Sequence, residues 1–334
     1  MTQTLAIFLD AYRSLNAKKM FWIVLALSGL VVAAFAMLGI NEDGLSIAFW
    51  QLDGEWAQWI NSDVIAPATF YKLLFSSFGI NIWLSTVATI LALISTAGIF
   101  PDLVGSGSID LVLCKPISRL RLFATQYVAG LLFVTLQVTV FCLACFLLIG
   151  IRGGSWEPGL FIAVPLVVCF FSYLFSVCVY VGVKTRSTLA ALLTTLLFWV
   201  FAFGLSYAEL FLEATAEAGP PSFNIFGEQS PTHDRPIDPE PPDWVVTGHR
   251  AVFALKSVMP KTTETVALLE RGLVDMAGMP SETSGRRRRT QVEFGEAMQK
   301  IMRRRSATWV IGTSLLFELV VLAAAAWIFC RRDF

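Results

Sequence analysis

Long uncharged apolar runs alternate with shorter polar segments along the chain. About 20 consecutive apolar residues in a helix are enough to cross a membrane, because each residue adds about 1.5 Å. The pattern therefore predicts an all-α polytopic membrane protein with six transmembrane helices. The predicted spans are residues 20–40, 73–100, 123–149, 159–183, 188–210 and 307–329.

Two of the polar segments have recognisable patterns of their own. Residues 2–19 carry apolar side chains at helical spacing, which predicts an interfacial elbow helix before the first span. The first outer loop, residues 41–72, is rich in aromatic residues such as Trp50, Trp56 and Trp59. Aromatic residues are typical of headgroup depth. Contact with a substrate is the alternative interpretation of this loop.

A long loop of different composition separates the last two spans. Prolines between Pro220 and Asp243 predict a poorly ordered stretch. Apolar periodicity then predicts two short amphipathic helices broken at Pro260, and a third over residues 294–302. We expect this amphipathic part of the loop to lie on the membrane surface. We therefore divide the chain into a membrane domain, this loop and a last span with the C-terminus. Their boundaries are residues 1–210, 211–306 and 307–334.

The distribution of basic residues predicts that both termini are cytoplasmic. This orientation leaves only Lys72 and Arg152 in the short outer loops, in agreement with the positive-inside rule. It also places the long loop outside, where the triplet 303–305 of arginines runs against that rule. The basic residues assigned to the cytoplasm are Arg13, Lys18, Lys19, Lys115, Arg119, Arg121, Lys184, Arg186, Arg331 and Arg332.

Composition narrows the possible functions. The chain is 56% hydrophobic and 15% charged, whereas soluble domains are about 25% charged. Its net charge is zero, so we expect no nucleic-acid partner. No G-x-x-x-x-G-K-[ST] loop for ATP phosphates is present. The only histidines, His233 and His249, lie in the long loop. We therefore expect no catalytic residue, no metal centre, no cofactor and no enzymatic activity in this chain.

Glu318 is the one ionisable residue well inside a predicted span. A charge at such a position costs about 2.5–3.5 kcal/mol on insertion scales, so its side chain should face protein or water. One interpretation is a structural hydrogen bond to a neighbouring Ser or Thr. The other is an intramembrane site for a proton or a substrate.

The segment between the second and third spans combines glycines, an acidic residue and a basic end. Gly105 and Gly107 allow a sharp turn, Ser108 can cap a short helix that Asp110 favours, and Pro116 ends it. This pattern predicts a short helix across the membrane surface. The candidate site residues are Asp102, Gly105, Gly107, Ser108, Ile109, Asp110, Leu111, Lys115, Pro116, Ile117, Ser118 and Arg119.

These residues carry a family resemblance. Asp102, the run Gly107–Leu111 and the ending Lys115–Arg119 closely resemble the cytoplasmic loop of type-2 ABC transporter permeases, the membrane subunits of exporters. The chain end, Trp327–Phe334, is similar to the end of such permeases. The resemblance extends from the N-terminus to about Tyr207 and again over the last span and the C-terminus.

The resemblance implies a function and a set of partners. The segment between the second and third spans would be a coupling helix that touches a separate ABC ATPase subunit. Two permease halves would pair within the lipid of the cell (inner) membrane, as a homodimer or a heterodimer. The chain would then export a substrate with ATP hydrolysed by its partner. The alternatives are a non-transporting scaffold or regulatory subunit of a membrane complex, and a proton-coupled secondary transporter that uses Glu318.

Overall fold

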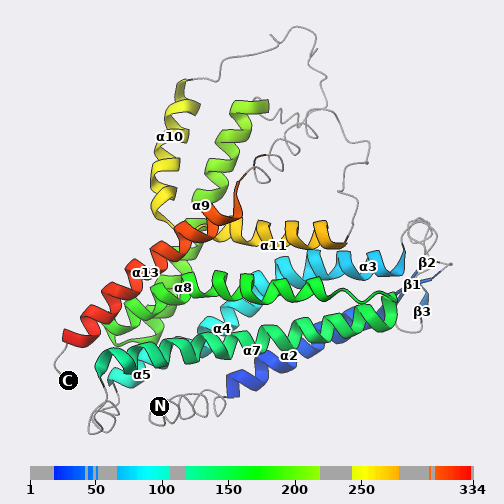
Figure 1. Cartoon of the computed structure of the whole chain (residues 1–334), viewed down its shortest axis with the longest axis horizontal. Helices are drawn as coiled ribbons and strands as arrows, with labels where there is room; N and C mark the ends of the chain where they lie inside the picture. The colour runs from blue at the N-terminus through cyan, green and yellow to red at the C-terminus, as the bar shows by residue number, and fades with distance from the viewer. Residues whose placement is uncertain are drawn as a thin grey trace.

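A computed structural model describes residues 19–41, 44–47, 50–51, 66–105, 118–218, 243–277, 301 and 305–331. Helices make up nearly all of these ranges (Figure 1). The predicted elbow helix therefore lies outside the described residues except for Lys19. The stretch 219–242 and most of the helix predicted over 294–302 lie outside them too.

The first helix leads directly into a small sheet. Helix α2 spans Lys19–Met37, and strands β1 (Leu38–Asn41), β2 (Gly44–Ile47) and β3 (Trp50–Gln51) follow it. The strands pair antiparallel in the order β1-β2-β3, with Leu38 opposite Ile47. The prediction of an all-α chain with a simple loop after residue 40 missed this sheet, because the strands are only two to four residues long.

The second predicted span is a composite helix. It begins at Pro67 in α3 (Pro67–Leu74), continues as the π-helix η1 (Phe75–Ala88), and ends in α4 (Thr89–Thr96) and α5 (Ile99–Gly105). The helix thus starts six residues before the predicted Leu73, because Pro67 at the first position fits a helix N-terminus. Where η1 meets α4, the hydroxyl of Thr89 donates to the carbonyl of Leu84, five residues earlier, at 2.8 Å.

The third and fourth spans form an antiparallel pair. Helix α7 spans Arg119–Gly153 and is capped by Ser118, whose Oγ accepts from the Arg121 amide at 3.3 Å. It ends at Gly154, where φ is 70°, a conformation that glycine adopts without a steric cost. The 3-10 turn η2 (Pro158–Ile162) then leads into α8 (Ala163–Thr185).

The last four helices are α9 (Thr188–Ala218), α10 (Asp243–Val258), α11 (Thr262–Ala277) and α13 (Ala307–Arg331). The two amphipathic helices predicted on either side of Pro260 are therefore present as α10 and α11. Helix α9 extends eight residues beyond the predicted end at Leu210. Glu209 and Glu213 consequently lie on a helix, whereas the sequence placed them in or beside a loop.

Membrane-crossing capacity follows from length and composition. Within the described ranges, five helical segments are long and apolar enough to cross a membrane: 67–104, 119–153, 158–185, 188–215 and 307–331. The first predicted span corresponds to α2, whose apolar part Phe21–Met37 is shorter. The membrane-protein character predicted from the sequence is supported in this sense, and the count of six spans stays a prediction.

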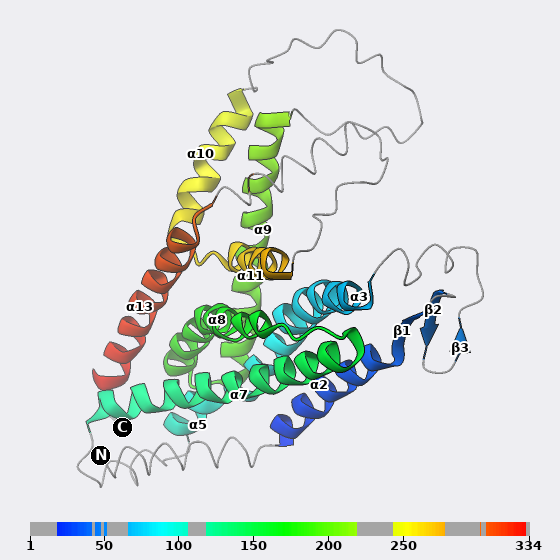
Figure 2. The ribbon, with the colours of Figure 1, turned by 45° about the vertical axis from the view of Figure 1, so that its right-hand side comes forward.

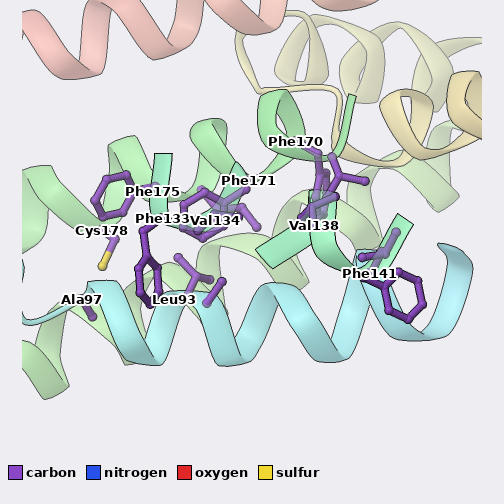
Figure 3. Packing of buried hydrophobic residues seen from close by; sticks show 14 of the residues in the cluster. Leu93, Ala97, Phe133, Val134, Val138, Phe141, Phe170, Phe171, Phe175 and Cys178 are labelled. Atoms are coloured by element: carbon purple, nitrogen blue, oxygen red, sulfur yellow. The ribbon is translucent and has the colours of Figure 1, made fainter. Parts of the chain in front are cut away.

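Helix α8 lies at the centre of the hydrophobic core. Its Phe170, Phe171 and Phe175 pack between α7 and α4 (Figure 3). The packing is close enough to require a glycine: a Cβ on Gly130 of α7 would lie 2.8 Å from the Phe175 ring. Filling this interface with aromatic rings fixes α7 against α8.

The helices diverge away from the end where α7 begins. Helices α2, α3 and α7 lead toward the small sheet, whereas α9, α10 and the start of α13 lead in another direction (Figures 1 and 2). Helix α11 lies between these two groups and contacts η1, η2, α8 and α13. We expected the amphipathic part of the long loop to lie on the membrane surface. Its second helix is packed into the protein, with Thr265 and Leu269 buried.

Candidate functional site

The structure describes both ends of the predicted coupling segment. Asp102 is exposed on α5, and Gly105 is the last residue of that helix. Ser118 caps α7 and Arg119 begins it. The residues between them lie outside the described ranges. These are Gly107, Ser108, Ile109, Asp110, Leu111, Lys115, Pro116 and Ile117.

The two ends of this segment are held together by packing. Phe100 of α5 and Phe123 of α7 have ring centroids 5.0 Å apart, and Phe123 lies 5.7 Å from Phe329 of α13. The Arg119 guanidinium donates to the Cys330 carbonyl at 3.2 Å. The coupling segment therefore leaves and rejoins a compact junction of α5, α7 and α13.

Basic side chains gather at this junction, which we call the basic end. The first turn of α7 carries Arg119 and Arg121, and the turn between α8 and α9 carries Lys184 and Arg186. Arg331 ends α13 and lies 4.5 Å from the Trp327 ring centroid. The α8–α9 turn is well defined: Arg186 has φ 56° and the Ser187 hydroxyl accepts from the Ala190 amide. Cations at helix C-termini also suit the helix dipole.

Glu318 is buried between three helices. Its Oε1 accepts from the Tyr127 hydroxyl of α7, and its Oε2 accepts from the Ser172 hydroxyl of α8, both at 2.7 Å. The hydrogen bond to a neighbouring Ser or Thr that the sequence suggested is therefore present. Tyr127 was not foreseen, because nothing in the spacing of α7 and α13 places it opposite Glu318. The role of Glu318 in transport stays a prediction.

Polar groups continue from Glu318 toward the start of α11. The Tyr173 hydroxyl is buried beside these groups without a hydrogen-bond partner among the described residues, and the charge of Glu318 acts on it. Ser314 accepts from the backbone amide of Lys261 at 2.9 Å. The ammonium of Lys261 donates to Thr313 at 2.8 Å and lies 4.2 Å from the Trp309 ring centroid.

Three carboxylates and two cations form a buried ion network where α9, α10, α11 and α13 meet. Arg305 pairs with Glu264 at 2.7 Å, with Glu209 at 3.0 Å and with Glu213 at 3.1 Å. Lys256 of α10 pairs with Glu209 and Glu264. We call these five residues the ion network. Sequence reasoning missed it, because its members are up to 96 positions apart and only the fold brings them together.

Two basic groups have shifted pKa values: Arg305, a member of the network, and Lys261, on which the charges of the network act. Burial opposes the charge of Arg305, but the carboxylates of Glu209 and Glu264 outweigh it and raise the pKa of its guanidinium. Burial lowers the pKa of Lys261, and the Glu264 carboxylate only partly offsets this effect. The surrounding carboxylates therefore favour the charged form of Arg305, whereas desolvation disfavours the charged form of Lys261.

The network explains why an arginine precedes the last span on the side predicted to be outside. Arg305 carries its charge among three carboxylates, so it adds little net positive charge at that position. Because its charge is compensated, Arg305 says little about which side of the membrane this loop is on under the positive-inside rule. Arg303 and Arg304 lie outside the described residues.

One group of side chains has the ligand types of a metal site: Glu209, Glu213 and His249. Among the described residues they form a group whose ligand atoms lie within 4.8 Å of one another. Both carboxylates, however, already pair with the Arg305 guanidinium, which a divalent cation would have to displace. The donor set with an arginine at its centre fits an ion network better than a metal centre.

Comparison with known proteins adds no family assignment. No protein-family model matches the chain, and no curated protein matches it.

Proposed function

We propose that this chain is the membrane-spanning permease subunit of an ABC exporter, which moves its substrate with ATP hydrolysed by a separate ATPase subunit. The main support is the sequence of the coupling segment together with its place in the fold. Both ends of that segment belong to the packed junction of α5, α7 and α13, surrounded by the cations of the basic end. In this proposal the basic end is cytoplasmic.

The junction suits a mechanical role. A segment that receives motion from an ATPase must pass it to the spans without flexing at its attachments. The Phe100–Phe123–Phe329 contacts and the bond from Arg119 to Cys330 join it to three helices at once. Movement of the segment would therefore shift α5, α7 and α13 together.

A second permease half belongs to the same proposal. Helices α9 and α13 are the least buried of the five described segments that are long enough to cross a membrane. In their most apolar stretches of 18 residues, only 17% and 22% of the residues are buried. On α9 the exposed face includes Leu189, Leu193 and Leu197. Such faces suit lipid or a second half of the transporter.

The test is a transport assay with the cognate ATPase co-expressed, alongside ATP hydrolysis by the purified complex. Asp110→Ala should weaken the start of the coupling helix by up to about 1 kcal/mol, and Gly107→Val should strain the entry to that helix if residue 107 adopts a positive φ. We expect both variants to insert normally and to lose transport. Arg152→Ala, at the far end of α7, is the matched control and should transport normally.

The alternatives have distinct outcomes in the same assays. Failure of any ATPase subunit to co-purify with the chain would favour a scaffold or regulatory subunit. Loss of transport in Glu318→Gln, with normal transport in both coupling-segment variants, would favour a proton-coupled secondary transporter.

A further inference from the structure

A cavity of about 400 Å³ lies between η1, α8, α9 and the first turns of α11. Its size is within the range of small-molecule sites, about 300–1,000 Å³. Trp199, Phe203 and Tyr207 of α9 form one wall, with Phe170 of α8 beside them. Phe203 and Tyr207 are also exposed at the outer surface of α9. The cavity therefore has an aromatic wall and an opening at the side of the helical assembly.

The opposite wall contains the start of α11. Thr262 and Thr263 line the cavity, and both of their side-chain hydroxyls are buried without a hydrogen-bond partner. Thr262 is 1% exposed. A buried hydroxyl without a partner costs free energy, so this arrangement is favourable only when something else supplies the bond.

The serine and threonine hydroxyls of η1 around the cavity already have acceptors. Ser85 and Thr86 of η1 also line it, and both donate to the Asn81 carbonyl within their own helix. Among the serine and threonine residues that line the cavity, Thr262 and Thr263 are thus the ones whose hydroxyls are left to donate to a ligand; the Tyr207 hydroxyl belongs to a side chain that is 45% exposed. The first amide groups of a helix, which have no acceptor inside it, add a positive potential at the same place.

The charge of the lining limits the chemistry of the ligand. No Asp, Glu, Lys, Arg or His is among the described residues that line the cavity. A formal charge on the ligand would therefore be buried without an opposite charge beside it. The cavity accordingly suits an uncharged molecule with an apolar or aromatic body and one hydrogen-bond acceptor.

We propose that this cavity binds an uncharged amphipathic molecule, whose body stacks against Trp199 and Phe203 and whose carbonyl-type oxygen accepts from Thr262 and Thr263. Access is lateral, past Phe203 and Tyr207. The site goes beyond the proposed function, because binding is a property of this chain alone and can be measured without an ATPase. The experiment below therefore leaves the exporter proposal untouched if it fails.

The test uses the full chain in lipid nanodiscs and 4-propargyloxybenzophenone, an uncharged aromatic ketone that cross-links on illumination. Peptide mapping should place the cross-links in α9 and α11. Unlabelled benzophenone should compete about three- to tenfold better than diphenylmethane, which has the same two rings without the ketone oxygen, because one net hydrogen bond is worth about that factor. The cationic analogue 4-(aminomethyl)benzophenone should compete worst.

Variants of the chain test the contribution of the two hydroxyls separately from that of the space and the aromatic wall of the cavity. Thr262→Val combined with Thr263→Val should abolish the preference for the ketone and keep labelling by stacking. Thr185→Val, which removes an exposed hydroxyl at the basic end, is the matched control and should change nothing. Ala267→Phe should fill the cavity and lower the labelling; Phe203→Ala tests the aromatic wall if the larger side chain prevents folding.

Cross-links spread over the exposed faces of many helices, without enrichment in α9 and α11, would overturn the proposal. Equal competition by benzophenone and diphenylmethane in the unchanged chain would overturn it as well.

Discussion

Buried glutamates occur in two different settings in this protein. Glu318 lies alone among neutral groups and accepts from the hydroxyls of Tyr127 and Ser172. Glu209 and Glu264 belong to the ion network, where Lys256 and Arg305 balance their charge. In the first setting, losing one hydrogen-bonding partner should lower the folding stability only a little, because the hydroxyls can rotate to other acceptors. The second depends on every member, because removing one cation leaves carboxylates buried without an opposite charge.

The difference also separates two regions of the fold. Glu318 sits where α7, α8 and α13 are fixed by aromatic packing, so its hydrogen bonds add to contacts that already hold these helices together. The ion network sits where α9, α10 and α11 meet Arg305. Among the described residues, the apolar cluster beside it is small and consists of Leu210, Ala214 and Ile301. We infer that charge holds the second region, whereas packing holds the first.

The largest effect is expected from Arg305→Met. It removes the partner shared by Glu209, Glu213 and Glu264, and breaking a buried pair in this way costs about 3–5 kcal/mol. Thermal unfolding in detergent, followed by protease cleavage between α10 and α11, should show a large loss of stability that begins in this region. Arg250→Met, on an exposed face of α10, is the control. An equal effect of both changes would contradict the assignment of the network.

Changes at Glu318 should have a smaller effect that depends on the replacement. Ser172 has one hydroxyl hydrogen but two acceptors, Glu318 at 2.7 Å and the Cys169 carbonyl at 2.8 Å. The amide of Glu318→Gln can donate to Ser172 and leave that hydrogen for Cys169, so we expect a change within about 1 kcal/mol. Glu318→Leu removes both hydrogen bonds to the carboxylate, each worth about 0.5–1.5 kcal/mol, and should cost about 1–3 kcal/mol. The Ser172 hydroxyl keeps the Cys169 carbonyl as acceptor, and the Tyr127 hydroxyl keeps the Ser172 carbonyl at 3.3 Å.

The same unfolding measurement tests the Glu318 variants. A loss of stability in Glu318→Gln as large as that in Glu318→Leu would show that the negative charge itself is required. The neutral setting inferred for Glu318 would then be wrong.

The smallest effect is a pH dependence from Lys261. Its folded pKa is below the unfolded value of about 10.4, so the unfolded chain binds more protons between these two values. Stability from this group should therefore rise as the pH rises through that window and be lower below it. Glu209, Glu264, Lys256 and Arg305 act on the group electrostatically.

Subtracting the pH profile of Lys261→Met from that of the unchanged chain isolates the contribution of Lys261 and of the charges coupled to it, because groups remote from Lys261 titrate equally in both. A difference that falls with rising pH in this window would contradict the lowered pKa.

Much of the fold follows from the sequence alone. Apolar run length specified the helices, because a long uncharged segment is stable in a membrane only when its backbone bonds internally. The break at Pro260 was likewise local, since it depends on one residue and its immediate neighbours. The same local information predicted that Glu318 needs a hydrogen bond, but not from Tyr127.

The features that depend on contacts between distant parts of the chain were decided by the tertiary structure. The ion network joins α9, α10, α11 and Arg305, and no periodicity in the sequence relates Glu209 to Arg305. The burial of α11 between η1, α8 and α13, and with it the unpartnered hydroxyls of Thr262 and Thr263, follows from how the helices diverge. The physical reason is that pattern specifies which face of a helix is apolar, whereas packing among all the helices decides what that face meets.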